Sequence, residues 1–244
     1  MLRKICLLGV ATSLLAFASV QAQSVDDLIA KHLDAVGGVE KLKSIQSMKI
    51  TGTSAIPAMG VTASFTRTSM RPNMMRMDVQ VQGQTMVQAY DGETAWQIVP
   101  FGGDPTPQAM PEAQAKYFRM QADLDGMLVD FKKKGHKIEF IGKEPVEEKD
   151  AYNLKVTMNT GDVTNIYLDT ESYLQVKSRL VTPGPGGNNL EIDSYFSDFK
   201  TVDGMTMAHT ITQNNPMQGK VETKMTEVQV NPEVDKSIFQ MPSK

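Results

Sequence analysis

The chain has 244 residues, of which 25 are Lys or Arg, 28 are Asp or Glu, and 41% are hydrophobic. This composition is that of a globular protein and is too polar for a protein with several membrane spans. The formal net charge of −3 argues against a nucleic-acid-binding protein, which would normally carry a basic surface. A chain of this length can bury a substantial core without disulfides or bound metal.

The N-terminus has the pattern of a cleavable secretion signal. Arg3 and Lys4 form a positively charged start, and an uncharged, mostly apolar run leads to a small-x-small cleavage site, Val-Gln-Ala, at 20–22. The run is shorter than the roughly 20 apolar residues that a membrane-spanning helix needs. We therefore expect the segment 1–22 to be removed. Residues 23–244 are then expected to form one domain in the periplasm, with an extracellular location as the alternative.

The only cysteine of the chain, Cys6, lies inside this signal. It comes too early to be the lipidated cysteine of a bacterial lipoprotein, so we expect a protein without a lipid anchor. The mature chain then has no cysteine, which excludes a disulfide, a thiolate nucleophile and a Cys-based metal site.

The mature chain is predicted to begin with an amphipathic helix. Ser24 followed by Asp27 is a capping pattern, and Gly37-Gly38 is a typical helix end. The apolar residues between them recur at helical spacing; they are Val25, Leu28, Ile29, Leu33 and Val36.

Beyond this helix the hydrophobic period changes to two, the period of a β-strand. Met75, Met77, Val79 and Val81 alternate with polar residues. Similar alternation occurs over 151–158, 173–181 and 205–211, and turn sequences such as Asp91-Gly92 separate the runs. The pattern predicts about eleven strands in an antiparallel sheet that has one buried face and one face in water.

One helical segment interrupts the strands, over residues 111–134. Its apolar residues recur every three or four positions, and it ends in a run of lysines, which the helix dipole favours there. The sequence therefore predicts an α+β fold in which a curved antiparallel sheet wraps around a few helices. Such a sheet leaves a concave apolar space that suits a small molecule, unless the helices fill it.

The sequence contains no recognisable catalytic arrangement. His32, His136 and His209 are scattered without metal-binding spacing. We find no nucleophile elbow, phosphate-binding loop or dinucleotide fingerprint. The sequence therefore gives no support to an enzymatic function, and we expect no cofactor and no bound metal.

Methionine is unusually frequent, with 17 residues, several of them within 59–86. Thioethers are soft ligands, so an exported methionine cluster could bind Cu(I). Methionine is also a flexible apolar residue that lines adaptable surfaces. We favour the lining role because Met75 and Met77 share one strand face while Met74 points to the other. A periplasmic Cu(I)-binding protein stays as the alternative.

The sole tryptophan, Trp96, follows an Asp-Gly turn and shares its strand face with Ile98. This pattern favours a core aromatic residue, with a ligand contact as the alternative. The side chains that we expect to line the apolar space are Met75, Met77, Val79, Trp96, Tyr117, Met120, Leu124, Met127, Leu128 and Phe131.

Segments spread over nearly all of the mature chain carry a family resemblance. They are HLDAVGG and the residues that follow it to 53, RPNMMRMDVQVQG at 71–83, YDGETAWQIVP at 90–100, residues 141–181, FKTVDGMTMAHTI at 199–211 and VNPEVDKSIFQMP at 230–242. In their order and spacing these segments resemble LolA-like outer-membrane lipoprotein-sorting proteins, especially the longer and divergent ones.

The resemblance implies a half-open antiparallel β-barrel closed by helices, with an apolar cavity that takes acyl chains. It implies a periplasmic carrier of a lipid or acylated lipoprotein rather than an enzyme, with possible transport partners in the cell envelope. It also implies an arginine in the cavity, for which Arg67, Arg76 and Arg119 are candidates. We expect a monomer. A structural module of the cell envelope, whose cavity is filled by its own side chains, is the remaining alternative.

Overall fold

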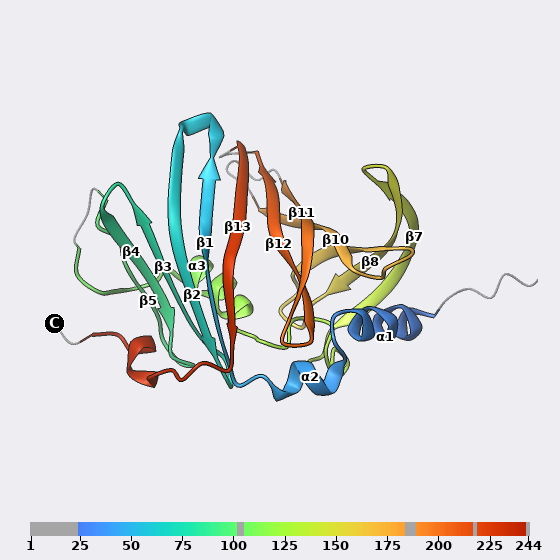
Figure 1. Cartoon of the computed structure of the whole chain (residues 1–244), viewed down its shortest axis with the longest axis horizontal. Helices are drawn as coiled ribbons and strands as arrows, with labels where there is room; N and C mark the ends of the chain where they lie inside the picture. Colours follow the sequence, from blue (N-terminus) through green and yellow to red (C-terminus); the bar gives the residue numbers. More distant parts are fainter. Residues whose placement is uncertain (1–23, 102–104, 184–188, 217–218, 243–244) are drawn as a thin grey trace, which may run out of the picture.

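The computed structural model describes residues 24–101, 105–183, 189–216 and 219–242, so the predicted signal at 1–22 lies outside the described residues. The described chain forms one antiparallel sheet of 13 strands, which curves without closing on itself (Figure 1). The predicted curved sheet with a few helices is confirmed. The strand count exceeds the predicted one.

The strands are joined mainly by hairpins, but their order in the sheet is shifted relative to the chain. From one edge to the other the order is β6-β5-β4-β3-β2-β1-β13-β12-β11-β10-β9-β8-β7. The first strand therefore pairs with the last in the middle of the sheet. The strands are β1 Ser47–Ile56, β2 Val61–Met70, β3 Met74–Val81, β4 Gln84–Tyr90, β5 Ala95–Ile98, β6 Gln108–Ala109, β7 Lys137–Val146, β8 Lys149–Thr157, β9 Val163–Asp169, β10 Gln175–Pro183, β11 Asn189–Val202, β12 Met205–Asn215 and β13 Gly219–Val230.

The first helix is confirmed as predicted. The Ser24 hydroxyl accepts a hydrogen bond from the Asp27 N–H at 3.1 Å, and the N–H of Gly38 donates to the carbonyl of Leu33 at 2.8 Å. The helical elements are α1 Val25–Ala35, α2 Val39–Ser44, η1 Pro57–Met59, α3 Glu112–Gln121 and η3 Lys236–Phe239. None of the helices among the described residues is long and apolar enough to cross a membrane.

The predicted helix over 111–134 is wrong in its second half. Helix α3 ends at Gln121, and turns follow up to Gly135. The Asp123 carboxylate accepts a hydrogen bond from the Asp125 N–H at 3.0 Å, and Gly126 has a φ of 66°. Side-chain capping by Asp and left-handed backbone at Gly both favour turns over a continued helix.

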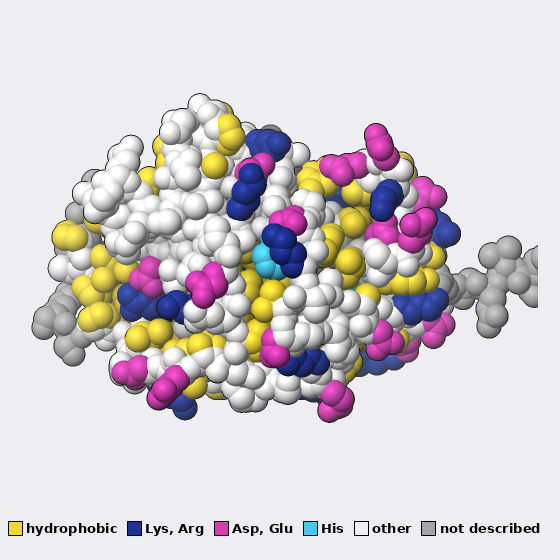
Figure 2. Space-filling view, in the orientation of Figure 1, with side chains coloured by type: hydrophobic (Ala, Val, Ile, Leu, Met, Phe, Trp, Pro, Cys, Tyr) yellow, Lys and Arg dark blue, Asp and Glu magenta, His cyan; other side chains and the backbone are white. Residues whose placement is uncertain are grey.

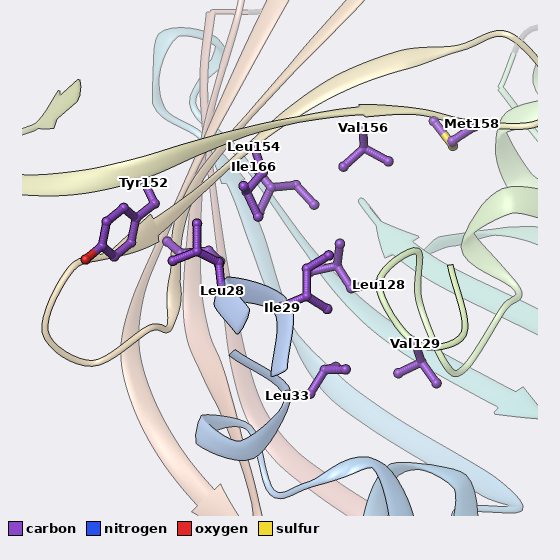
Figure 3. Close-up of a cluster of buried hydrophobic side chains, with 11 residues drawn as sticks. Leu28, Ile29, Leu33, Leu128, Val129, Tyr152, Leu154, Val156, Met158 and Ile166 are labelled. Carbon is purple, nitrogen blue, oxygen red and sulfur yellow. The ribbon is translucent and has the colours of Figure 1, made fainter. Parts of the chain in front are cut away.

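The concave face of the sheet is covered at one end by α1 and by the turns that follow α3. Figure 3 shows Leu28 and Ile29 of α1 on one side of this cluster and Leu154 of β8 on the other. The other buried members are Leu33, Leu128, Val129, Tyr152, Val156, Met158, Ile166 and Leu168. Burying this many apolar side chains supplies a large part of the driving force for folding.

Helix α3 covers the same face near the opposite end, behind β1 and β13 in the view of Figure 1. Its Ala115 and Phe118 are buried against Met75 and Tyr90 of β3 and β4. This cluster and the cluster of α1 are separate from each other.

The C-terminal η3 segment lies on the other face of the sheet. There the Trp96 indole N–H donates to the carbonyl of Phe239 at 2.7 Å.

Arg71, just after β2, ties α2 and the turn after α3 to the sheet. Its guanidinium donates to the carbonyls of Ile45 at 2.6 Å and Leu42 at 3.2 Å. It also pairs with the Asp125 carboxylate, with Nη1 and Oδ2 3.0 Å apart. The bidentate pair with Arg71 lowers the pKa of Asp125.

We expect Arg71→Met to lower the free energy of unfolding by about 2–4 kcal/mol, because it leaves a partly buried carboxylate without its partner. Arg119→Met is the matched control, since the Arg119–Glu112 pair lies on the surface. That change should cost less than about 1 kcal/mol. Urea denaturation measures both values, and equal losses would contradict the role assigned to Arg71.

His32 of α1 is buried and held in a fixed position. Its Nδ1 donates to the carbonyl of Tyr173 at 2.8 Å. Burial lowers the pKa of His32, and the hydrogen bond raises it by less. The imidazole is therefore neutral in the folded protein at neutral pH.

Acid should destabilise the protein through His32. The unfolded chain binds a proton at this residue at a higher pH than the folded chain. The contribution of neutral His32 to stability is therefore complete above the pKa of His32 in the unfolded chain, and it is lost as the pH falls below that pKa. The loss approaches about 1.4 kcal/mol per pH unit for one group. Urea denaturation at pH 8 and 5.5 should show it.

His32→Gln should show a flatter dependence of stability on pH than the wild type. The pKa of His136 is also lowered by burial, so His136→Gln controls for the contribution of that residue. A wild-type pH dependence in His32→Gln would contradict the assignment.

Candidate functional site

A cavity of about 590 Å³ lies on the concave face, between α3 and the middle strands of the sheet. It adjoins the apolar cluster beneath α3, to which its lining residue Phe118 belongs. The lining residues are Ile50, Ser54, Ile56, Val61, Ala63, Phe65, Arg67, Met77, Val79, Gln88, Gln114, Tyr117, Phe118, Gln121, Ile211, Thr223 and Met225. Cavities of about 300–1,000 Å³ with mainly apolar walls are typical of small-molecule sites.

The floor of the cavity is shaped by a glycine. Gly52 pairs with Phe65 across β1 and β2, and a Cβ atom at Gly52 would lie 2.8 Å from the Phe65 ring and 2.1 Å from the Lys224 carbonyl oxygen. Only glycine therefore permits this close approach of the strands and the ring. The Phe65 side chain forms part of the apolar wall as a result.

Arg67, the one charged residue among the described residues of the lining, lies at one end of the cavity with polar neighbours. Arg67, Met77 and Gln88 are neighbours in register across β2, β3 and β4. Helix α3 adds Tyr117 and Gln121 to the lining. Toward the β1–β2 turn the lining is uncharged and mainly apolar. Its two hydroxyl side chains, Ser54 and Thr223, lie 3.3 Å apart and hydrogen-bond to each other.

Arg67 is the cation of this cavity. Its Nη2 donates to the carbonyl of Gln121 at 2.7 Å, and its Nε donates to the Ser69 hydroxyl at 3.3 Å. Burial lowers the pKa of Arg67, but an arginine side chain stays charged in proteins. The guanidinium keeps donors that neither bond uses.

The other arginines of the described chain are paired with carboxylates. The pairs are Arg71–Asp125, Arg76–Asp78, Arg119–Glu112 and Arg179–Asp193. Arg67 has no carboxylate partner among the described residues, and no Asp or Glu lines the cavity. Of the three candidates for a cavity arginine, only Arg67 lines the cavity.

Three of the predicted lining residues do line this cavity: Met77, Val79 and Tyr117. Two others lie in close-packed cores. Met75 is fully buried beneath α3, two residues before Met77 in β3. Trp96 pairs with Ala89, so it points to the face opposite Gln88 and packs with the C-terminal segment.

The predicted apolar stripe of 111–134 is divided between two places because the helix ends at Gln121. Tyr117 stays at the cavity and is 46% exposed. Leu124 is half-buried in the turns. The remaining members pack on or in the cluster of α1; they are Met120, Met127, Leu128 and Phe131. Leu128 and Phe131 also line a separate groove of about 440 Å³ beside α1.

Most of the cavity wall comes from residues that the sequence did not single out. Ile50 and Ile56 of β1, Ile211 of β12 and Met225 of β13 lie on it because these strands are neighbours in the sheet. Alternation indicates that each of these residues shares a face with its own strand neighbours. It does not indicate that β1 pairs with β13.

The methionines that cluster in the sequence do not gather at one place. Met59 lies exposed at the β1–β2 turn, Met75 lies beneath α3, and Met77 lies at the cavity. No group of three His, Cys, Asp or Glu side chains in the described ranges is arranged to hold a metal ion.

The fold is shared with solved structures. A DUF1329 family protein from Desulfovibrio piger has a TM-score of 0.61 and 11% identity, covering 88% of this chain and 97% of that chain. The LolA superfamily protein NE2245 from Nitrosomonas europaea has a TM-score of 0.57 and 13% identity, covering 87% and 96%. A domain assigned to outer-membrane lipoprotein sorting, from Vibrio parahaemolyticus, has a TM-score of 0.57 and 12% identity, covering 87% and 94%.

No protein-family model matches the sequence, and no curated protein matches it either. The low identities to the solved structures show a common fold and nothing finer. The chain therefore has a divergent LolA-like fold, which confirms the resemblance found in its sequence.

Two methionines of β3 provide a direct test of the cavity boundary. Met75→Glu places a carboxylate in a fully packed core, at an expected cost of several kcal/mol. Met77→Glu places it at the cavity, where water can hydrate it, so the cost should be much smaller. Thermal unfolding of the two variants measures the difference, and equal losses would mean that Met77 also lies in a filled core.

Proposed function

We propose that the protein is a periplasmic carrier that binds acyl chains of a lipid or lipoprotein in this cavity and transfers them toward the outer membrane. The observation that carries the proposal is the cavity of about 590 Å³, walled mainly by apolar side chains on the concave face of a LolA-like sheet. A packed structural module would have no such space.

The energetics of burial support an acyl ligand. Each methylene that leaves water for an apolar wall contributes about 0.8 kcal/mol, so about ten buried methylenes would contribute about 8 kcal/mol before the costs of association. Phe65, Met77 and Met225 supply such a wall. Methionine suits a wall that must fit a flexible chain, because its side chain adapts to irregular shapes.

The chemistry of the lining supports binding rather than catalysis. Among the described residues, no His, Cys, Asp or Glu lines the cavity. An acid–base pair or an activated nucleophile would normally need at least one of these. Two of the similar structures are named for the LolA superfamily and for lipoprotein sorting, which agrees with a carrier.

In this proposal the signal at 1–22 delivers the chain to the periplasm, where it acts as a monomer. Partners in the cell envelope would load the ligand and accept it. Release would need a change in cavity shape or a competing acceptor, because an apolar chain doesn't leave such a wall for water unaided.

Mass spectrometry of organic extracts tests the proposal. Protein purified without detergent from the periplasm should carry an acyl compound at about one per protein. Met77→Glu should reduce the bound amount because it places a charge on the cavity wall. Ile141→Glu is the matched control, since Ile141 is 52% exposed on β7, away from the cavity.

An extract of the wild-type protein without any acyl compound, together with no uptake of added fatty acid, would overturn the proposal. That result would favour a structural module of the cell envelope. An equal loss of ligand in Ile141→Glu would show that the cavity isn't the binding site.

A further inference from the structure

The cavity is chemically divided along the length of β2. At one end, Arg67 has Met77 of β3 and then Gln88 of β4 as its cross-strand neighbours. Gln121 of α3 lies at the same end, where its carbonyl accepts from Arg67. Three alternations away, Val61 pairs with Ile56, and both side chains are apolar. Beside Ala63, between the two ends, the hydroxyls of Ser54 and Thr223 hydrogen-bond to each other, so this part of the wall is uncharged. A ligand that fits this wall has one polar end and one apolar end.

We infer that the ligand is an amphiphile with a single acyl chain and one anionic head, bound with the head at Arg67 and the chain running toward Val61. The inference rests on the proposed function and narrows its ligand class. The anionic head is a carboxylate or a phosphate attached to one acyl chain, and the experiment below distinguishes these two heads.

The charge of Arg67 is the evidence for an anionic head group. A buried cation is costly unless a counter-charge compensates it. Arg71, Arg76, Arg119 and Arg179 have protein carboxylates in that role, whereas the acceptors of Arg67 in the described part of the chain are two neutral groups, the Ser69 hydroxyl and the Gln121 carbonyl. An anionic head would complete the pairing and accept the donors that the Gln121 and Ser69 contacts leave free.

The volume of the cavity is the evidence for a single chain. A water molecule occupies about 30 Å³ in the liquid and a methylene group about the same, so a chain of about 16 carbons needs about 480 Å³. The cavity of about 590 Å³ takes one such chain and not two. From Arg67 to Val61 the strand rises about 20 Å, at about 3.3 Å per residue. A chain of about 15 Å, half of a bilayer's hydrocarbon core, fits this length.

Displacement of a neutral fluorescent probe, N-phenyl-1-naphthylamine, tests the inference on delipidated protein. The competitors are oleate, oleyl alcohol, 1-oleoyl lysophosphatidic acid and dioleoyl phosphatidic acid. We expect oleate or lysophosphatidic acid to displace the probe at a concentration about ten-fold to a hundred-fold lower than oleyl alcohol, the range for hydrogen bonds to a charged group. Dioleoyl phosphatidic acid should displace it poorly.

Variants of Arg67 assign this preference to its charge. Arg67→Gln should remove the preference for the anion, so that oleate and oleyl alcohol displace the probe at similar concentrations, whereas Arg67→Lys should keep part of the preference. Arg76→Gln is the matched control, because Arg76 lies on the opposite face of the neighbouring strand and pairs with Asp78. The wild-type comparison of oleate with oleyl alcohol stands even if a variant fails to fold.

The outcomes separate the inference from the proposed function. Equal displacement by oleate and oleyl alcohol, or an unchanged preference in Arg67→Gln, overturns the anionic head. Displacement by dioleoyl phosphatidic acid as effective as by the single-chain lipid overturns the single chain. A probe that doesn't bind and acyl compounds that show no binding by calorimetry overturn the proposed function itself. A preference for oleate over lysophosphatidic acid, or the reverse, identifies the head.

Discussion

The structure depends on how an open, curved sheet covers its apolar concave face. Apolar surface must leave water for the sheet to be stable, and this chain covers the two ends of that face with separate elements. Helix α1 and the turns around Leu128 cover β7–β9, and α3 covers β3–β5. The strands between them, where β1 pairs with β13, line the cavity and belong to neither cluster. The cavity follows from this division.

The placement of charge distinguishes the two faces of the sheet. On the face seen in Figure 2, basic and acidic side chains lie close together. Across β10 and β11, Asp193 pairs with both Arg179 and Lys177. The concave face has Arg67 in its cavity without a carboxylate nearby. A cation that the protein itself doesn't neutralise is a stronger indication of an anionic ligand than a basic surface patch, because burial removes the compensation by water.

The sequence was sufficient for the elements with a clear period. Alternation placed Met77 and Val79 on one face, and the spacing from Ser24 to Gly38 predicted α1. The alternation of residues could not show which face of the sheet carries Trp96, because alternation relates only residues of the same strand to one another. It also missed the end of α3 at Gln121, where capping by Asp123 outweighs the apolar spacing. Residues such as Met225 reach the cavity through the β1–β13 pairing, which no local pattern encodes.

The central claim is that the space between α3 and the middle strands holds an acyl chain. The most direct measurement is a crystal structure of the protein purified without detergent and without delipidation. The account predicts continuous, elongated density that runs along β2 from the Arg67 guanidinium to the Val61 and Ile56 side chains. A cavity closed by rearranged side chains of α3, or one that contains only discrete water molecules in protein shown to be otherwise native, would contradict it.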